Sequence, residues 1–368
     1  MKILILANHY NTLRIFRREL LKKLVEIGCE VVVSIPPCDD QNRNTLISYG
    51  CRVIFTKEMA RRGMNPLQYL SLLLAYRKLI KQESPDKVIT YTIKPNIYGS
   101  YACKQLHIPC YANVTGLGSA FQCHGMMRKL VSAMYKFSMN KCKKIFFENE
   151  GNRKTLVDDK IVRMEQTIVM PGAGVNLNEF TATPYPEEQA PLRFLFVGRI
   201  MQEKGVDEYF EAIRRIKAKY TDTEFHFIGW YEDNYEAKVK TLEKQGLIHF
   251  HGFQLDVKPF IEQAHCIVLP SWHEGMSNTL LEASAMCRPI ITNRIHGCME
   301  AVEEGVTGYL CEKQNADSLY SALQTFIELP YEKKKIMGIA GRQRMVDIFD
   351  KMQVVQKTIH VILEEPSC

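Results

Sequence analysis

The sequence predicts an α/β protein with two parallel-sheet domains, one after the other along the chain. Its 368 residues exceed what one hydrophobic core usually organises. Short apolar runs alternate with amphipathic stretches in both halves, which is the pattern of a parallel sheet covered by helices. A polar, proline-rich stretch over 183–191 indicates the connection between them. We therefore expect domains over residues 1–175 and 190–345, and a helical segment over 346–368 that can pack back on the first domain.

Seven short runs in the first half are expected to form strands. Each is rich in apolar and β-branched residues, and polar or turn-forming residues bound it. The expected strands are residues 3–7, 31–35, 52–55, 87–91, 110–113, 144–147 and 167–170. The loop after the first of them lacks the Gly-x-Gly-x-x-Gly pattern of dinucleotide-binding proteins, which argues against an NAD enzyme.

Several residues of the first half follow strand ends, where open α/β sheets bind their ligands. His9 follows the first strand and Lys94 follows the fourth. Thr115 follows the fifth strand, and Gly116 and Gly118 behind it would let a ligand approach the backbone closely. For His9, a loop position without a role is an equal alternative.

Five runs in the second half predict another parallel sheet: residues 193–197, 224–228, 247–251, 266–269 and 289–292. The run over 266–269 is followed by a small, polar loop and then by good helix formers. A strand, a sharp turn and a helix therefore succeed one another at this point.

The start of that helix predicts a binding site for a nucleotide sugar. A helix N-terminus presents unpaired N–H groups and the positive end of its dipole to an anion. The residues placed there are Gly275, Met276, Ser277, Asn278 and Thr279. Glu274 lies in the loop and Glu282 lies on the helix, and a carboxylate repels phosphate but accepts two hydrogen bonds from a sugar diol. Two solvated surface glutamates are the alternative.

Charge is distributed unevenly along the chain. The net charge is +7, but residues 1–180 carry 27 Lys and Arg against 14 Asp and Glu, whereas the remainder carries 21 against 27. A basic first half predicts an anionic partner, either nucleic acid or an anionic membrane surface. Residues 125–144 combine apolar residues at helical spacing with many cations, which fits a packed helix with a solvated basic face or a helix lying on anionic lipid.

The cysteine pattern favours a cytoplasmic enzyme with reduced thiols. The chain has twelve cysteines, but no Cys-x-x-Cys pair and no Cys/His cluster, so neither a zinc site nor a disulfide framework is expected. The apolar run at the N-terminus is too short for a signal peptide. No run of about 18 apolar residues occurs, so no transmembrane helix is expected.

The second half resembles the signature of family 4 retaining glycosyltransferases, which have the GT-B fold of two Rossmann-like domains facing across a crevice. The similarity begins with an apolar strand ending in Pro270-Ser271 and with Glu274 and Glu282, which have seven residues between them. It continues through Cys287-Arg288-Pro289-Ile290-Ile291-Thr292, His296-Gly297-Cys298-Met299-Glu300 and Gly305-Val306-Thr307-Gly308-Tyr309-Leu310. These motifs occur in the family's order, so the resemblance implies the GT-B fold.

A further motif resembles the phosphate clamp of the same family. Gly198 and Arg199 follow a strand, and Lys204 lies shortly after them. The resemblance implies that Arg199, Lys204 and Glu274 are catalytic, with the two cations stabilising charge on the leaving diphosphate. Two ordinary surface cations are the alternative. The chain has no Asp-x-Asp sequence, so no metal and no cofactor are expected.

The first half is similar to a narrower group, the N-acetylgalactosaminyltransferases that extend a diphospho-undecaprenol-linked sugar in bacterial glycan assembly. Phe16-Arg17, Lys94 and Gly116-Leu117-Gly118-Ser119 carry this similarity. It implies an acceptor site formed by His9, Arg17, Lys94, Thr115, Gly116 and Gly118. Where the family often has a His near the reacting carbon, this chain has Thr115, so the residue that takes this role stays open, with His124 as one candidate.

These features favour a retaining glycosyltransferase that is peripheral on the cytoplasmic face of the plasma membrane. It is expected to transfer a sugar, GalNAc or GlcNAc in the first instance, from a UDP-sugar to a polyprenyl-diphosphate-linked saccharide of an O-antigen, capsule or glycoprotein. The expected partners are the nucleotide sugar, the lipid-linked acceptor and an anionic membrane surface, and no nucleic acid. A UDP-N-acetylglucosamine 2-epimerase and a non-catalytic glycan- or lipid-binding protein are the alternatives.

Overall fold

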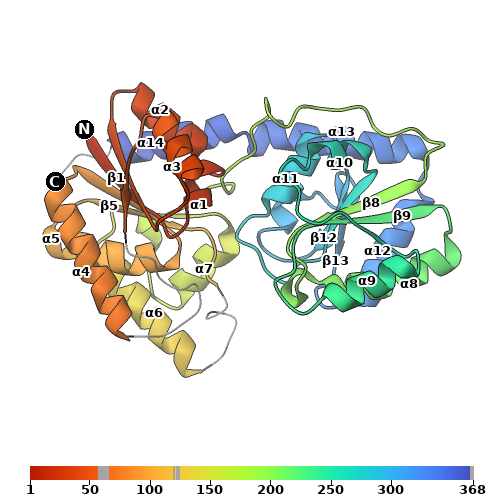
Figure 1. Cartoon of the computed structure of the whole chain (residues 1–368), viewed down its shortest axis with the longest axis horizontal. Helices are drawn as coiled ribbons and strands as arrows, with labels where there is room; N and C mark the ends of the chain where they lie inside the picture. Colours follow the sequence, from red (N-terminus) through yellow and green to blue (C-terminus); the bar gives the residue numbers. More distant parts are fainter. Residues whose placement is uncertain (57–65, 119–120, 122–124, 365–368) are drawn as a thin grey trace. The chain divides into compact units, whose positions relative to one another are not determined.

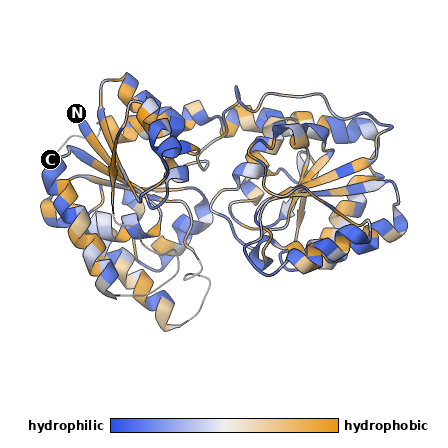
Figure 2. Cartoon of the chain, viewed as in Figure 1, coloured by the Kyte–Doolittle hydropathy of each residue, from blue (hydrophilic) through white to orange (hydrophobic). Residues whose placement is uncertain are grey.

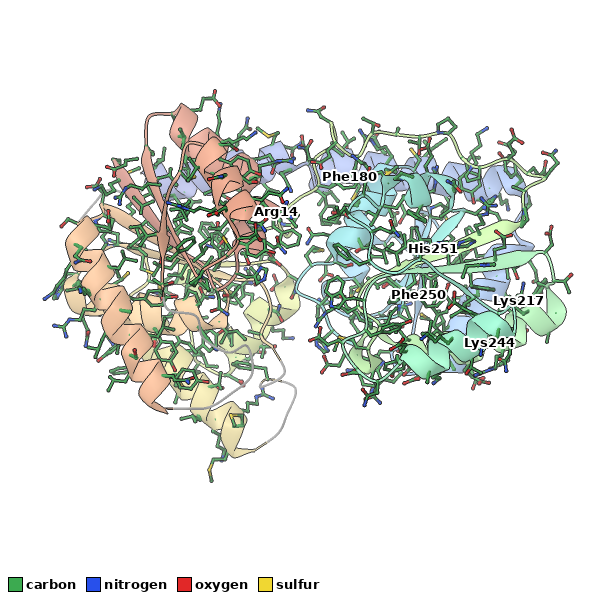
Figure 3. All side chains as sticks on the ribbon, viewed as in Figure 1. Arg14, Phe180, Lys217, Lys244, Phe250 and His251 are labelled. Carbon is green, nitrogen blue, oxygen red and sulfur yellow. The ribbon has the colours of Figure 1, made fainter. Side chains whose placement is uncertain are left out.

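The structure is a computed structural model that describes residues 1–56, 66–118, 121 and 125–364. The chain forms two compact units (Figure 1): Met1–Ala173 with Met352–Cys368, and Gly174–Lys351. Each unit has its own parallel sheet with helices around it, so the expected α/β class is confirmed. Side chains fill the space between each sheet and its helices (Figure 3).

The first unit is built on seven parallel strands. These are β1 (Lys2–Leu6), β2 (Glu30–Ile35), β3 (Arg52–Phe55), β4 (Lys87–Tyr91), β5 (Cys110–Val114), β6 (Lys144–Phe147) and β7 (Thr167–Val169). Their order across the sheet is β3-β2-β1-β4-β5-β6-β7. All seven expected strands are present, and their ends differ from expectation by one residue at most. The winding direction changes between β1 and β4, which is where such sheets bind ligands beyond the strand ends.

Helices cover both faces of this sheet. They are α1 (Tyr10–Arg14), α2 (Arg18–Glu26), α3 (Asp40–Ser48), α4 (Pro66–Glu83), α5 (Ser100–Leu106), α6 (Met126–Met139), α7 (Glu150–Asp158) and α14 (Lys351–Glu364), with short turns at Pro95–Gly99 and Met164–Gln166. Because side chains alternate along a strand, Ile3 and Ile5 enter one core with α2 and α14, whereas Leu4 and Leu6 enter another with α4, α5 and α6. The C-terminal helix thus contributes to the core of the first unit through Val354.

Side-chain caps define the starts of α3 and α7. The Asp39 carboxylate accepts the backbone N–H of Asn42 at 2.8 Å at the start of α3. The Asn149 amide oxygen accepts the N–H of Asn152 at 2.8 Å at the start of α7. Each cap satisfies one of the N–H groups that a helix start leaves unpaired. The second of these caps fixes the chain immediately after β6.

The second unit contains six parallel strands. They are β8 (Leu192–Val197), β9 (Thr223–Ile228), β10 (His249–Phe250), β11 (Cys266–Leu269), β12 (Ile290–Asn293) and β13 (Gly308–Cys311), in the order β10-β9-β8-β11-β12-β13. The helices are α8 (Val206–Lys219), α9 (Glu236–Lys244), α10 (Lys258–Gln263), α11 (Asn278–Ala285), α12 (Ala316–Glu328) and α13 (Tyr331–Ile348), with turns at Gln202–Lys204 and Met299–Ala301. One hydrophobic core joins them, and the stacked rings of Phe194 and Phe225 lie within it.

Two strands of this sheet differ from expectation. Of the expected run 247–251, only His249 and Phe250 form strand β10, which lies at the edge of the sheet and pairs with β9. Strand β13 was not expected, since it is short and starts with a glycine. Gly308 is needed there, because a Cβ atom would lie 2.0 Å from the carbonyl oxygen of Ile290 on the neighbouring strand.

Candidate active site

The predicted anion site lies between β11 and α11 in the second unit. Ser277 is the N-terminal cap of α11, and its N–H donates to the carbonyl oxygen of Gly297 at 2.8 Å. Asn278 and Thr279 form the first turn, which contains no acidic residue. The Met276 side chain is buried and anchors the loop in the core. The first N–H groups of α11 therefore stand at the carboxyl edge of the sheet, in the arrangement that favours an anion.

Backbone segments from three loops pack directly on one another around this site. Gly205 has φ +70°, and a Cβ atom there would lie 2.0 Å from the carbonyl oxygen of Pro270. Gly297 has φ +89°, and a Cβ atom would lie 2.6 Å from the carbonyl oxygen of Gly275. The buried Asn293 amide donates to the carbonyl oxygens of Pro270 and Ser271 at 2.7 and 2.9 Å. These contacts hold the loop after β11 against the loops after β8 and β12.

The two predicted clamp cations each lie beside a carboxylate. Lys204, at the end of the turn Gln202–Lys204, pairs with Glu274, and both side chains are 16% exposed. Arg199, two residues after β8, lies 3.3 Å from a carboxylate oxygen of Glu232. Gly198 precedes it and donates its N–H to the carbonyl oxygen of Ile228 at 2.9 Å. A ligand diphosphate would therefore meet cations that are already positioned.

Glu232 is a residue of this site that sequence reasoning missed. It lies in the loop after β9, and its N–H donates to the carbonyl oxygen of Ile200 at 3.2 Å. Residues 200 and 231 form a short parallel bridge that extends the pairing of β8 with β9. The strand order could have pointed to Glu232, because the loops that follow neighbouring parallel strands lie at the same edge of a sheet.

Glu282 faces a less polar environment than a surface carboxylate. Its side chain is partly buried on α11. Burial raises the pKa of Glu282 from 4.5 to about 7, with the charge of Lys351 opposing the rise and that of Glu179 adding to it. Glu282 therefore loses its proton at a higher pH than a solvent-exposed glutamate does.

The predicted acceptor residues of the first unit are engaged in different ways. The His9 ring caps α1 by accepting the N–H of Asn11 at 3.1 Å. Lys94 lies 5.9 Å from the centre of the Tyr69 ring, and burial lowers its pKa. Arg17 pairs with Glu148 at 2.8 Å.

The glycine-containing loop after β5 is described only in part. Thr115 follows the strand directly, Gly116 has φ +150° and Gly118 has φ +72°. A Cβ atom at Gly118 would lie 2.7 Å from the Ile93 side chain, so a glycine fits this position best. Ser119 and His124, which the sequence also singled out, lie outside the described residues.

Neither a metal centre nor a membrane span is found in the part of the chain that the structure describes. Within it, no group of three or more His, Cys, Asp and Glu side chains could hold a metal ion. None of its helices has both the length and the apolar character needed to cross a membrane.

Family models match both units. The model described as "Glycosyl transferase 4-like" matches residues 2–149, and the model described as "Glycosyl transferases group 1" matches residues 191–328. The chain is therefore a glycosyltransferase with the GT-B fold. It belongs to family 4, the group 1 glycosyltransferases, as the resemblance of its motifs implied. Both matches are to glycosyltransferases, so the epimerase alternative is not favoured.

Two curated relatives match most of the chain. The N,N'-diacetylbacillosaminyl-diphospho-undecaprenol alpha-1,3-N-acetylgalactosaminyltransferase of Campylobacter jejuni is 26% identical over 329 residues, which are 85% of this chain and 86% of the relative. The UDP-Gal:alpha-D-GlcNAc-diphosphoundecaprenol alpha-1,3-galactosyltransferase of Escherichia coli is 27% identical and covers 80% of each chain.

Solved structures show the same fold. HepE from Anabaena in complex with UDP and glucose has a TM-score of 0.78 at 17% identity, covering 98% of this chain and 99% of that one. A glycosyltransferase from Rickettsia africae has a TM-score of 0.77 at 19% identity, covering 99% of both chains.

Proposed function

We propose that this glycosyltransferase transfers a sugar, GalNAc or GlcNAc in the first instance, from a UDP-sugar to a polyprenyl-diphosphate-linked saccharide. The use of a UDP-sugar as donor is supported by the site around α11. This site combines Arg199, Lys204, a helix N-terminus and two glutamates. The choice of a polyprenyl-diphosphate-linked acceptor is supported by the names of the two curated relatives, both of which act on undecaprenyl-diphosphate-linked sugars.

Donor binding would exchange the partners of the clamp cations. In the ligand-free site Lys204 pairs with Glu274, and Arg199 pairs with Glu232. A diphosphate carries more charge than a carboxylate and would compete for both cations. Glu274 would then be released to accept hydrogen bonds from sugar hydroxyls, while Glu282 accepts those of the ribose. Once the donor has bound, the two cations would stabilise the charge that develops on the departing UDP.

The transfer is proposed to retain the anomeric configuration. In this scheme the acceptor hydroxyl attacks from the face that the diphosphate leaves, and a phosphate oxygen takes its proton. No side chain needs to act as the base, which fits Thr115 standing where the family often has a His. The product would carry the same anomeric configuration as the donor sugar, which NMR of the product can test.

A membrane surface is proposed as the place of reaction, because the acceptor carries a lipid. Helix α6 exposes Met126, Leu130 and Phe137 to 86%, 49% and 57%, and α4 exposes Leu70 and Leu74 to 54% each. Figure 2 shows apolar residues recurring along both helices. Lys129 and Lys136 are exposed on α6, and α6 contains no acidic residue. Apolar and cationic side chains together suit an anionic leaflet, which supports the proposal that the protein works at the cytoplasmic membrane surface.

The proposed function is tested by a donor and acceptor screen read by mass spectrometry. The protein is incubated with UDP-GalNAc, UDP-GlcNAc, UDP-galactose or UDP-glucose, each with several sugar-diphosphate-polyprenols. One donor is expected to lengthen one acceptor by one sugar. Conversion of a donor without acceptor would support the epimerase, and binding without turnover would support a non-catalytic protein.

A further inference from the structure

The backbone of the turn that follows strand β4 is strained at Thr92. The φ angle of Thr92 is +72°, in the left-handed region that most residues avoid. A branched Cβ makes this region especially unfavourable, and Thr92 is the one β-branched residue with a positive φ in the part of the chain that the structure describes. Glycine adopts such a conformation without strain, so the backbone alone would favour glycine at position 92.

The Thr92 side chain makes no hydrogen bond that would explain a threonine at this position. Its carbonyl oxygen accepts the N–H of Asn96 at 3.0 Å, so Thr92 stands where a helical segment begins. A threonine at the start of a helix usually caps it with its hydroxyl group. Here the hydroxyl oxygen is buried and has no hydrogen-bond partner among the described residues. Backbone strain and a buried, unpaired hydroxyl group both lower the stability of the fold.

A network of buried hydrogen bonds holds the strained turn in place. Thr90 donates to the side-chain oxygen of Asn96 at 2.7 Å, and the Asn96 amide group donates to the carbonyl oxygen of Asn113 at 2.7 Å. The Asn113 amide group donates to the carbonyl oxygen of Thr90 at 3.3 Å. These bonds fix the chain on both sides of Thr92. A strained backbone persists where its surroundings enforce it, and such places are often functional sites.

Lys94 lies two residues after Thr92 and carries the positive charge of this turn. Its ammonium group lies 5.9 Å from the centre of the Tyr69 ring, which stacks on the Tyr98 ring at 5.4 Å. Burial lowers the pKa of Lys94, so an anion bound beside it would favour its charged form. A cation and an unused hydroxyl group therefore occur together in a fixed turn, at the edge of the sheet where such folds bind ligands.

We propose that the Thr92 hydroxyl group binds the diphosphate of the lipid-linked acceptor, together with Lys94. The inference rests on the proposed function and adds a residue to its acceptor site. The hydroxyl group would donate to a phosphate oxygen in a charge-assisted hydrogen bond, while Lys94 offsets the phosphate charge. Thr92 is partly exposed, and rotation about its Cα–Cβ bond moves the hydroxyl group to another staggered position while the backbone stays in place. Binding would thus give the hydroxyl group the partner that it lacks in the ligand-free protein.

The test compares Thr92→Ser, which keeps a hydroxyl group, with Thr92→Ala, which lacks it. Neither side chain is β-branched, so both variants relieve the same part of the strain. Two quantities are measured: KM for the lipid-linked acceptor that the wild-type protein extends, and the inhibition constant of undecaprenyl diphosphate, which carries no sugar. Both are expected to be roughly 10–100-fold higher in Thr92→Ala than in Thr92→Ser, the effect of losing a hydrogen bond to a charged group. The UDP affinity should be the same in the two variants.

Ser84→Ala is the matched control, because it also removes a hydroxyl group at a position with positive φ. Ser84 has φ +45° and lies before β4, whereas Thr92 lies after it. The Ser84 hydroxyl group donates to the carbonyl oxygen of Lys81 at 3.1 Å, so it already has a partner within the fold. Ser84→Ala should change neither the acceptor KM nor the inhibition constant. Thermal melts check folding, and Thr92→Ala should melt no lower than Thr92→Ser, since it loses only an unpaired hydroxyl group.

Three outcomes would overturn the inference. Equal acceptor KM values in the serine and alanine variants would show that the hydroxyl group contacts no acceptor. A higher KM in Thr92→Ala with an equal inhibition constant would place the hydroxyl group at the acceptor sugar and not at the diphosphate. If wild-type protein extends no lipid-linked acceptor at all, the proposed function fails and this inference fails with it. The first two results leave the wild-type activity intact, so the two kinds of failure can be told apart.

Discussion

Replacing Glu282 by Gln is expected to weaken UDP binding and to stabilise the ligand-free protein at alkaline pH. The two effects have one cause. The partly buried Glu282 carboxylate binds the ligand when ionised, but its ionisation lowers the stability of the folded protein. Burial raises the pKa of Glu282 from 4.5 to about 7. The folded protein therefore holds a proton that the unfolded chain has lost between these values, and stability falls as the pH rises through this window.

The size of the effect follows from the shift. One pKa unit corresponds to about 1.4 kcal/mol, so a rise from 4.5 to about 7 amounts to at most about 3.5 kcal/mol. Glu282 is partly exposed, and the remaining solvent reduces this figure, so we expect about 1–3 kcal/mol. The penalty is fully present above about pH 7 and disappears toward pH 4.5. Glutamine does not ionise, so the Glu282→Gln variant should not show this loss of stability.

Thermal melts and calorimetry at pH 5 and pH 8 measure both effects. Glu282→Gln should raise the melting temperature by a few degrees at pH 8 and hardly at all at pH 5. At pH 8 it should weaken UDP binding by about tenfold, because a charged acceptor is replaced by a neutral one. Glu211→Gln, a change at an exposed site of the same unit, is the control and should do neither. Unchanged UDP affinity, or a melting temperature that shifts equally at both pH values, would refute the reasoning.

Four other changes have defined outcomes. Changing Arg199 or Lys204 to Ala should lower the transfer rate by about a hundredfold or more, and a loss below about tenfold in steady-state assays would contradict the clamp. Activity should persist in EDTA, and loss that magnesium restores would show that a metal does this work. Reversing Lys129 and Lys136 to Glu should release the protein from anionic liposomes in a flotation assay, while the same reversal at two exposed lysines of α9 should not. Gly205→Ala should destabilise the second unit by about 1–3 kcal/mol in chemical denaturation, because its Cβ would lie 2.0 Å from a carbonyl oxygen of the loop after β11; unchanged stability would show that this loop can move.

Buried strands and local motifs could be predicted from the sequence. Apolar runs predicted every strand of the first unit, and the run is longest in strands such as β1 and β2, which are buried on both faces. The succession of β11, the loop with Glu274 and helix α11 is local, so its geometry followed from neighbouring residues. The strand expected over 247–251 was too long. The apolar run does not show that only two of its residues pair with the neighbouring strand.

Contacts between distant residues could not be predicted in this way. Arg17 pairs with Glu148 across 131 positions of sequence. Arg128, one of the cations of the segment 125–144, lies 2.9 Å from Asp159. Each pairing depends on which strands and helices become neighbours, which no local pattern shows. For this reason the charge-reversal test above uses Lys129 and Lys136, which are exposed.

The release of UDP, measured together with the mass of the lipid product, tests the central claim most directly. The wild-type protein is supplied with the donor and acceptor identified by the screen, and parallel reactions omit the acceptor. Our account predicts that UDP release depends on the acceptor and equals the amount of acceptor extended by one sugar. Donor turnover that is unaffected by the acceptor, or that leaves the lipid-linked sugar unchanged, would contradict it.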